Sequence, residues 1–154
     1  MNPYFRKLLE DFADRIGLSG DDLVAMGEVV VDMTTVSLVH QPCGDHDRDG
    51  NGGDVVLFAV LAVPPIGDQL DLYQAALEAN MLWTGTRGAT LGLQAGSGAF
   101  TVCRREPLPG LTDAALVELV GNFADTAECW NDFVRARHTR GFEAARPSPL
   151  YLRA

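Results

Sequence analysis

The chain has 154 residues, and its 21 Asp or Glu residues outnumber its 12 Lys or Arg residues, which gives a formal net charge of −9 at pH 7. The length suits one domain with a core of its own, while the acidic balance disfavours nucleic acids and anionic membranes as partners, because both need a basic surface. No apolar run is long enough to span a membrane, the first residues do not form a secretory signal, and the 3 cysteines are too few and too far apart for a disulfide framework. We therefore expect a soluble, cytoplasmic protein.

The first predicted element is a helix between Asn2 and Gly17. Asn2 is a favourable N-cap, Pro3 suits the first helical position, and Gly17 stands where helices commonly end. The main apolar stripe of this helix follows spacings of four, three and four, and consists of Phe5, Leu9, Phe12 and Ile16. Tyr4 and Leu8 form a smaller apolar stripe beside it.

Three strand-like runs follow a connector at residues 20–22. They lie at residues 28–32, 35–40 and 55–63. A loop rich in Gly and Asp, residues 41–53, separates the second run from the third. The third run is apolar at every position before Pro64, so we expect both of its faces to be covered, the second one by another chain.

The second half of the chain contains two predicted helices with a hairpin between them. The helix over residues 67–83 places Leu70, Tyr73 and Leu77 on one face and Asp71, Gln74 and Glu78 on the other. The hairpin consists of residues 89–93 and 99–103 with a glycine-containing turn. The last helix begins after Thr112, its N-cap, and its apolar stripe is Leu116, Val120, Phe123, Ala127, Trp130 and Val134.

This order of elements predicts the fold class. The pattern α-β-β-β-α-β-β-α indicates an α+β fold, in which helices flank an antiparallel sheet. We expect one domain over residues 1–140 and a loose C-terminal tail at residues 141–154, which holds two prolines. Five arginines and one acid lie within residues 135–154, so this end of the chain is basic.

The acidic loop is the most conspicuous candidate for a metal site. Alternating carboxylates before Gly50 resemble the way calcium loops arrange oxygen ligands, and these carboxylates belong to Asp45, Asp47 and Asp49. The twelfth position of such a loop requires Glu, but here it is Val56. A small calcium-binding module therefore remains an alternative, and a solvated loop is the simpler interpretation. A zinc site would use His40, Cys43 and His46, but the spacing supplies no fourth ligand.

The sequence contains no arrangement typical of an enzyme. Ser97 lies between two glycines but does not match the Gly-x-Ser-x-Gly motif, and hairpin geometry explains those glycines. There is no phosphate-binding loop and no nucleophile with a neighbouring base, so a small hydrolase is disfavoured. We expect no catalysis and no cofactor.

Several segments together resemble one known family. They are Leu77–Asn80 and Thr86–Leu93, the turn at residues 96–98, Phe100–Val102, and the helix bearing Phe123, Trp130 and Phe133. Together with the small size and acidic charge, they resemble the Tir chaperone (CesT) family, the class I chaperones of bacterial type III secretion. The resemblance covers about residues 3–135. The YbjN-like proteins are similar in fold, and a dimer of that kind with a regulatory role is a second alternative.

The resemblance implies a cytoplasmic homodimer without catalysis. It would bind an extended segment near the N-terminus of a secreted effector and keep that effector soluble and competent for secretion. By this resemblance, the dimer interface consists of Leu70, Tyr73, Leu77 and Leu91. Effector contacts are expected at apolar grooves and by strand addition, through Tyr4, Leu8, Val29, Val31, Val36 and Leu38.

Overall fold

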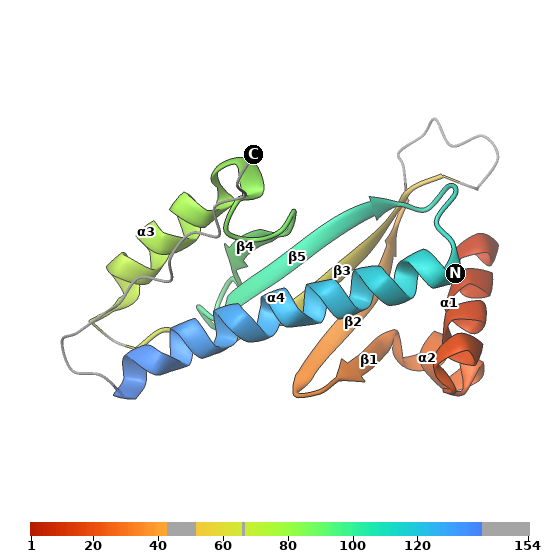
Figure 1. Cartoon of the computed structure of the whole chain (residues 1–154), viewed down its shortest axis with the longest axis horizontal. Coiled ribbons are helices and arrows are strands. Elements are labelled where there is room, and N and C mark those ends of the chain that lie inside the picture. The colour runs from red at the N-terminus through yellow and green to blue at the C-terminus, as the bar shows by residue number, and fades with distance from the viewer. Residues whose placement is uncertain (43–51, 66, 140–154) are drawn as a thin grey trace. The chain divides into compact units, whose positions relative to one another are not determined.

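The computed structural model describes residues 1–42, 52–65 and 67–139 (Figure 1), and the chain divides into two compact units. Unit 1 comprises Met1–Phe58 and Arg104–Ala124, and unit 2 comprises Ala59–Cys103 and Asp125–Ala154. The strands form a five-stranded sheet in the order β1-β2-β3-β5-β4, and helices accompany it. The predicted α+β class with an antiparallel sheet is confirmed. One domain over residues 1–140 stays a prediction, and the tail at 141–154 lies outside the described residues.

Helix α1 (Pro3–Ile16) begins and ends as its sequence predicts. The Asn2 side chain accepts hydrogen bonds from two backbone N–H groups of the first turn, and Gly17 ends the helix in the left-handed conformation with φ 75°. Phe5, Leu9 and Phe12 are buried as predicted, whereas Ile16, in the last turn, is exposed. The main stripe of α1 is therefore part of the core of unit 1.

A short helix, α2 (Gly20–Met26), stands where the sequence predicted a connector. The Ser19 hydroxyl accepts a hydrogen bond from the Asp22 N–H, and two aspartates in the first turn favour the positive helix end. Leu23 and Val24 are buried. The helix has 7 residues, so it is too short for a repeating apolar stripe, which explains why periodicity missed it.

Strands β1 (Glu28–Val31), β2 (Thr34–Gln41) and β3 (Asp54–Val60) are joined by antiparallel pairing. Along β3 the buried residues alternate with half-buried or exposed ones, and Val55, Leu57 and Ala59 are the buried ones. The second face is thus only partly covered within the chain, and its cover by another chain stays a prediction. The strand also ends before residue 63, close to two prolines that have no N–H to donate.

In unit 2, α3 (Gln69–Asn80) leads through a short 3-10 turn, η1 (Met81–Trp83), to strand β4 (Thr90–Leu93) (Figure 1). Strand β5 (Phe100–Pro107) pairs antiparallel with β4, which confirms the predicted hairpin. The buried face of α3 consists of Leu72, Ala76 and Ala79. The stripe that the sequence singled out on α3 is thus not the one that packs into the unit's core.

The last helix, α4 (Asp113–Thr139), has 27 residues and follows the prediction closely. The Thr112 hydroxyl accepts a hydrogen bond from the Ala115 N–H, which confirms the N-cap. All six residues of the predicted apolar stripe are buried. The Trp130 Nε1–H donates to the Gly85 carbonyl oxygen at 3.1 Å, so the one polar atom of this buried side chain has a hydrogen-bond partner. No helix in the described ranges is both long and apolar enough to cross a membrane.

Candidate functional site

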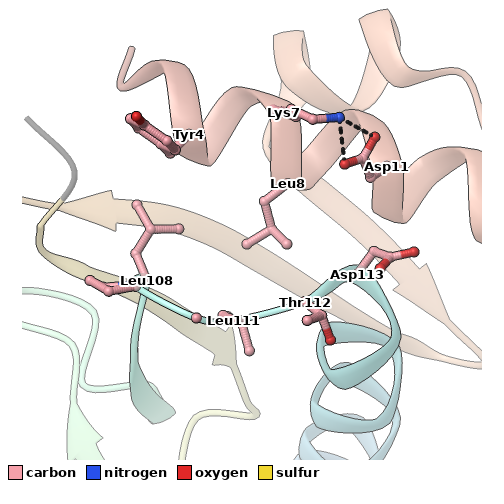
Figure 2. Close-up of a pocket in the computed structure, with 10 residues that line it drawn as sticks. Tyr4, Lys7, Leu8, Asp11, Leu108, Leu111, Thr112 and Asp113 are labelled. Carbon is pink, nitrogen blue, oxygen red and sulfur yellow. Dashed lines mark hydrogen bonds and ion pairs between the residues drawn. The ribbon is translucent and has the colours of Figure 1, made fainter.

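Unit 1 contains a pocket between α1 and the segment that joins β5 to α4. Its cavity volume is about 510 Å³. The α1 side contributes Tyr4, Lys7, Leu8 and Asp11, and the opposite side is formed by residues 108–113. Figure 2 shows Leu8 pointing from α1 across the cavity toward Leu111. The pocket thus includes the smaller apolar stripe of α1 that the sequence identified.

Local sequence explains both walls of this pocket. Residues three and four apart lie on one side of a helix, so Tyr4, Leu8 and Asp11 face the cavity together. On the other wall, Pro107 ends β5, and the Leu108 N–H donates to the Gly53 carbonyl oxygen at 2.9 Å. Gly110 has φ 83°, a conformation that glycine adopts without strain, and it turns the chain toward α4.

Two ion pairs lie at one end of the pocket. The Lys7 ammonium group donates to both carboxylate oxygens of Asp11, at 2.8 and 3.0 Å, and the Arg15 Nε donates to Asp113 Oδ2 at 2.5 Å. The hydrogen bond from Arg15 lowers the pKa of Asp113 below its ordinary value. The hydrogen bond to Asp11 raises the pKa of Lys7 above its ordinary value, so the ammonium group of Lys7 stays charged at neutral pH.

The effector-contact residues predicted from sequence differ widely in accessibility. Tyr4 is 54% exposed and Leu8, at the base of the pocket, is 7% exposed. Val29, Val36 and Leu38 are buried, so in this structure they are core residues of unit 1, and Val31 is half-buried. The sequence analysis missed the exposed apolar residues on the same two strands, Val30 and Val39. The alternation of side chains along a strand could have identified them, because the neighbours of a buried residue point to the opposite face of the sheet.

Unit 2 exposes the apolar stripe that α3 does not bury. Leu70 is 77% exposed and Leu77 is 72% exposed. The turn η1 adds three exposed apolar residues in a row, Met81, Leu82 and Trp83. We call these five residues the α3–η1 face. Monomeric proteins seldom display so many large apolar side chains along one short segment, so the face is a candidate interaction surface.

The other two predicted interface residues are less accessible than the α3–η1 face. Tyr73 is half-buried, and its ring lies 5.9 Å from the ring of Phe100. Leu91 is buried in β4. The sequence analysis missed most of η1, although three consecutive apolar residues at a helix end were a visible signal. Leu82 and Trp83 have φ values of 55° and 53°, an uncommon conformation for large side chains, and both residues are exposed.

Asn80 fixes α3 to the edge of the sheet. Its side-chain amide donates to the Leu91 carbonyl oxygen at 3.0 Å, and its carbonyl oxygen accepts from the Leu91 N–H at 2.8 Å. The side chain therefore pairs with β4 as a neighbouring strand would. Since β4 is an edge strand, this pairing closes part of an otherwise open edge and positions the α3–η1 face.

The candidates for metal binding and catalysis gain no support among the described residues. Asp45, Asp47 and Asp49, like Cys43 and His46, lie outside those residues. His40 Nε2 lies 3.1 Å from the Gly52 carbonyl oxygen, and the described ranges contain no cluster of three possible metal ligands. The Ser97 hydroxyl donates to Gln94 and accepts from the Ala99 N–H, so it stabilises the hairpin turn.

Comparison with known proteins agrees with the geometry. The model of the Tir chaperone protein (CesT) family matches residues 7–131. No curated protein sequence matches the chain. One similar solved structure is the HopA1–SchA chaperone–effector complex, with 21% sequence identity, a TM-score of 0.59, and coverage of 85% of this chain and 95% of that chain.

Two further solved structures share the fold. The ExsC–ExsE complex has 20% sequence identity and a TM-score of 0.63, and the match covers 87% of this chain and 96% of that one. The Yersinia pestis type III secretion chaperone SycH, in complex with a stable fragment of YscM2, has 20% identity and a TM-score of 0.56, with coverage of 82% and 98%. These likenesses identify the fold, and the family model identifies the family.

Proposed function

The chain belongs to the Tir chaperone protein (CesT) family, and on that premise we propose that it is a cytoplasmic type III secretion chaperone that acts by binding alone. Its client is the extended N-terminal segment of a secreted effector, which it keeps soluble and competent for secretion. The observation that carries this proposal is the family match across residues 7–131, which includes the α3–η1 face and the pocket wall on α1 except for Tyr4. The chaperone–effector complexes among the similar structures support an effector as the partner.

We assign self-association to unit 2. A second copy of the chain would cover the exposed stripe of α3, with Leu70 and Leu77 at its centre and Tyr73 at its margin. Burial of large aliphatic and aromatic side chains is the main favourable contribution in obligate interfaces. Leu91 supports this surface from β4 through its hydrogen bonds with Asn80. The function therefore rests on a homodimer in which unit 2 supplies the contact.

We assign client contact to unit 1. Tyr4 and Leu8 offer apolar surface in the pocket, and Val31 offers a half-buried side chain on the edge strand β1. An extended client adds hydrogen bonds along a strand and inserts alternate side chains into pockets. Val29, Val36 and Leu38 support these contacts from the core rather than from the surface.

Co-purification tests the proposal. The tagged chain is co-expressed with the first ~150 residues, about one domain, of each large protein encoded beside its gene. We expect one such segment to co-purify, while a segment of equal length from the C-terminal half of the same protein does not. Equal recovery of both segments, or recovery of neither for every neighbouring gene, would contradict a secretion chaperone.

A further inference from the structure

Strand β4 forms one edge of the five-stranded sheet. Along an antiparallel strand, residues that bond to the partner strand alternate with residues whose backbone groups point away from it. Leu93 lies opposite Phe100 on β5. Phe100 bonds away from β4, because its N–H donates to the Ala62 carbonyl oxygen and its own carbonyl oxygen accepts from the Leu61 N–H. The backbone groups of Leu93 therefore face the free side of β4, and so do those of Leu91, two residues earlier.

The Asn80 side chain occupies the first of these two positions. Its amide N–H donates to the Leu91 carbonyl oxygen at 3.0 Å, and its own carbonyl oxygen accepts from the Leu91 N–H at 2.8 Å. Both outward groups of Leu91 are thus bonded, so a further strand could pair only with Leu93. Strands in proteins commonly extend over about three to ten residues, so this single position is too little for stable pairing.

The turn after Asn80 is attached to the same strand and packs closely. The Trp83 indole N–H donates to the Thr90 hydroxyl at 3.3 Å, so η1 is bonded to β4 as well as α3. Two residues later, a Cβ on Gly85 would lie 2.7 Å from the Ala79 Cβ, which leaves room only for glycine. These contacts hold Asn80 beside β4, so its amide is in place before another strand arrives.

The pairing with Leu91 requires the amide group of asparagine. One side chain must donate to a carbonyl oxygen and accept from an N–H of the same residue, as a neighbouring strand does. An amide offers both a donor and an acceptor, whereas an ionised aspartate only accepts and alanine does neither. Asn80 is half-buried, so water has limited access to these hydrogen bonds.

We propose that Asn80 closes the β4 edge against the strands of other copies of this chain. The sheet has two edges, β1 and β4, and a sheet that can pair at both edges has no limit to its assembly. With β4 closed, copies meet through the side chains of the α3–η1 face instead of by extension of the sheet at β4. This inference rests on the proposed function, because it states what restricts self-association to that face.

Sedimentation velocity and amide hydrogen exchange of the full chain test this inference. Asn80→Ala opens the edge, and we expect species larger than the wild-type one, in a proportion that rises with concentration. In these species the Leu93 N–H exchanges about tenfold more slowly than in the wild type, because it gains a strand hydrogen bond. Asn80→Asp keeps the size of the side chain but loses the donor, so we expect the same two changes at pH 7.

A proline at position 93 shows whether the larger species form through this edge. Proline has no N–H, and at a position that faces the free side of an edge strand it leaves the bonds to the partner strand intact. We expect Leu93→Pro alone to keep the wild-type mass, and Leu93→Pro combined with either Asn80 variant to restore it.

Three results would overturn the inference. They are Asn80 variants that form no species larger than the wild type, larger species that persist when Leu93→Pro is added, and loss of the fold in both Asn80 variants. The proposed function is judged separately. A monomeric wild type would contradict the homodimer, yet larger species with Asn80→Ala would still support closure of the edge, and co-purification of an effector segment depends on neither result.

Discussion

The two units of this chain differ in how far their apolar helix stripes are buried. Unit 1 buries its main apolar stripe, carries a net charge of −8, and contains a pocket with two ion pairs at one end. Unit 2 has a net charge of −1 and exposes five large apolar residues along the α3–η1 face. High charge keeps a protein soluble, whereas an uncharged apolar face favours association. The comparison indicates that one unit meets a client and the other meets a second copy.

The largest effect is expected from a charge placed on the α3–η1 face. Leu77→Asp puts a carboxylate at the centre of the proposed interface, where it loses its water on association. We expect the dimer dissociation constant to rise at least about 30-fold, as for a hot-spot residue, when it is measured by analytical ultracentrifugation. Val30→Asp is the matched control, because Val30 is similarly exposed but belongs to unit 1. An equal loss of dimer in both variants would break the comparison.

Two glycine substitutions are expected to change stability in opposite directions. A Cβ at Gly85 in unit 2 would lie 2.7 Å from the Ala79 Cβ, so Gly85→Ala should lower the free energy of unfolding by about 1–3 kcal/mol. Gly121 lies within α4 in unit 1 with no atom in the way of a Cβ, so Gly121→Ala should raise it by about 0.5–1 kcal/mol. Urea denaturation measures both, and a stable Gly85→Ala variant would refute the close packing of α3 against this turn.

The smallest effect concerns acid stability of unit 1. The pKa of Asp113 is lowered in the folded chain by the hydrogen bond from Arg15, so its contribution to stability is present above the ordinary pKa of 3.8 and is lost as pH falls below it. We expect the wild type to melt slightly above Asp113→Asn at pH 7, and the difference to vanish at acid pH. Asp14→Asn controls for the loss of a charge. A difference in melting temperature that increases as the pH falls would contradict the pairing of Asp113 with Arg15.

Local signals in the sequence predicted much of the fold. Asn2, Gly17 and Thr112 mark helix ends through hydrogen bonds that involve only neighbouring residues, so their roles could be predicted without tertiary structure. The stripe of α4 is large and regular, and burial follows directly from it. Helix α2 was missed because its 7 residues make only about two turns, too few for a repeating apolar stripe, although Ser19 with two following aspartates is a recognisable start.

The candidate site was harder to predict than the fold. Helix α3 has two apolar faces, and periodicity alone cannot tell that small residues such as Ala76 and Ala79 pack inward while Leu70 and Leu77 stay outside. The pocket depends on contacts between α1 and residues 108–113, which are distant in sequence. Tyr4 and Leu8 were found because they share a helical stripe, but their acidic neighbour Asp113 was found only from the structure.

The central claim is that the chain dimerises through one unit and binds its client through the other. Light scattering during gel filtration measures the mass of the complex with the co-purified effector segment. We predict the mass of two chains of 16.6 kDa each plus one segment. For the Leu77→Asp variant, we predict the mass of one chain plus one effector segment. A wild-type complex with only one chain, or a Leu77→Asp chain that keeps its dimer and loses the segment, would contradict the account.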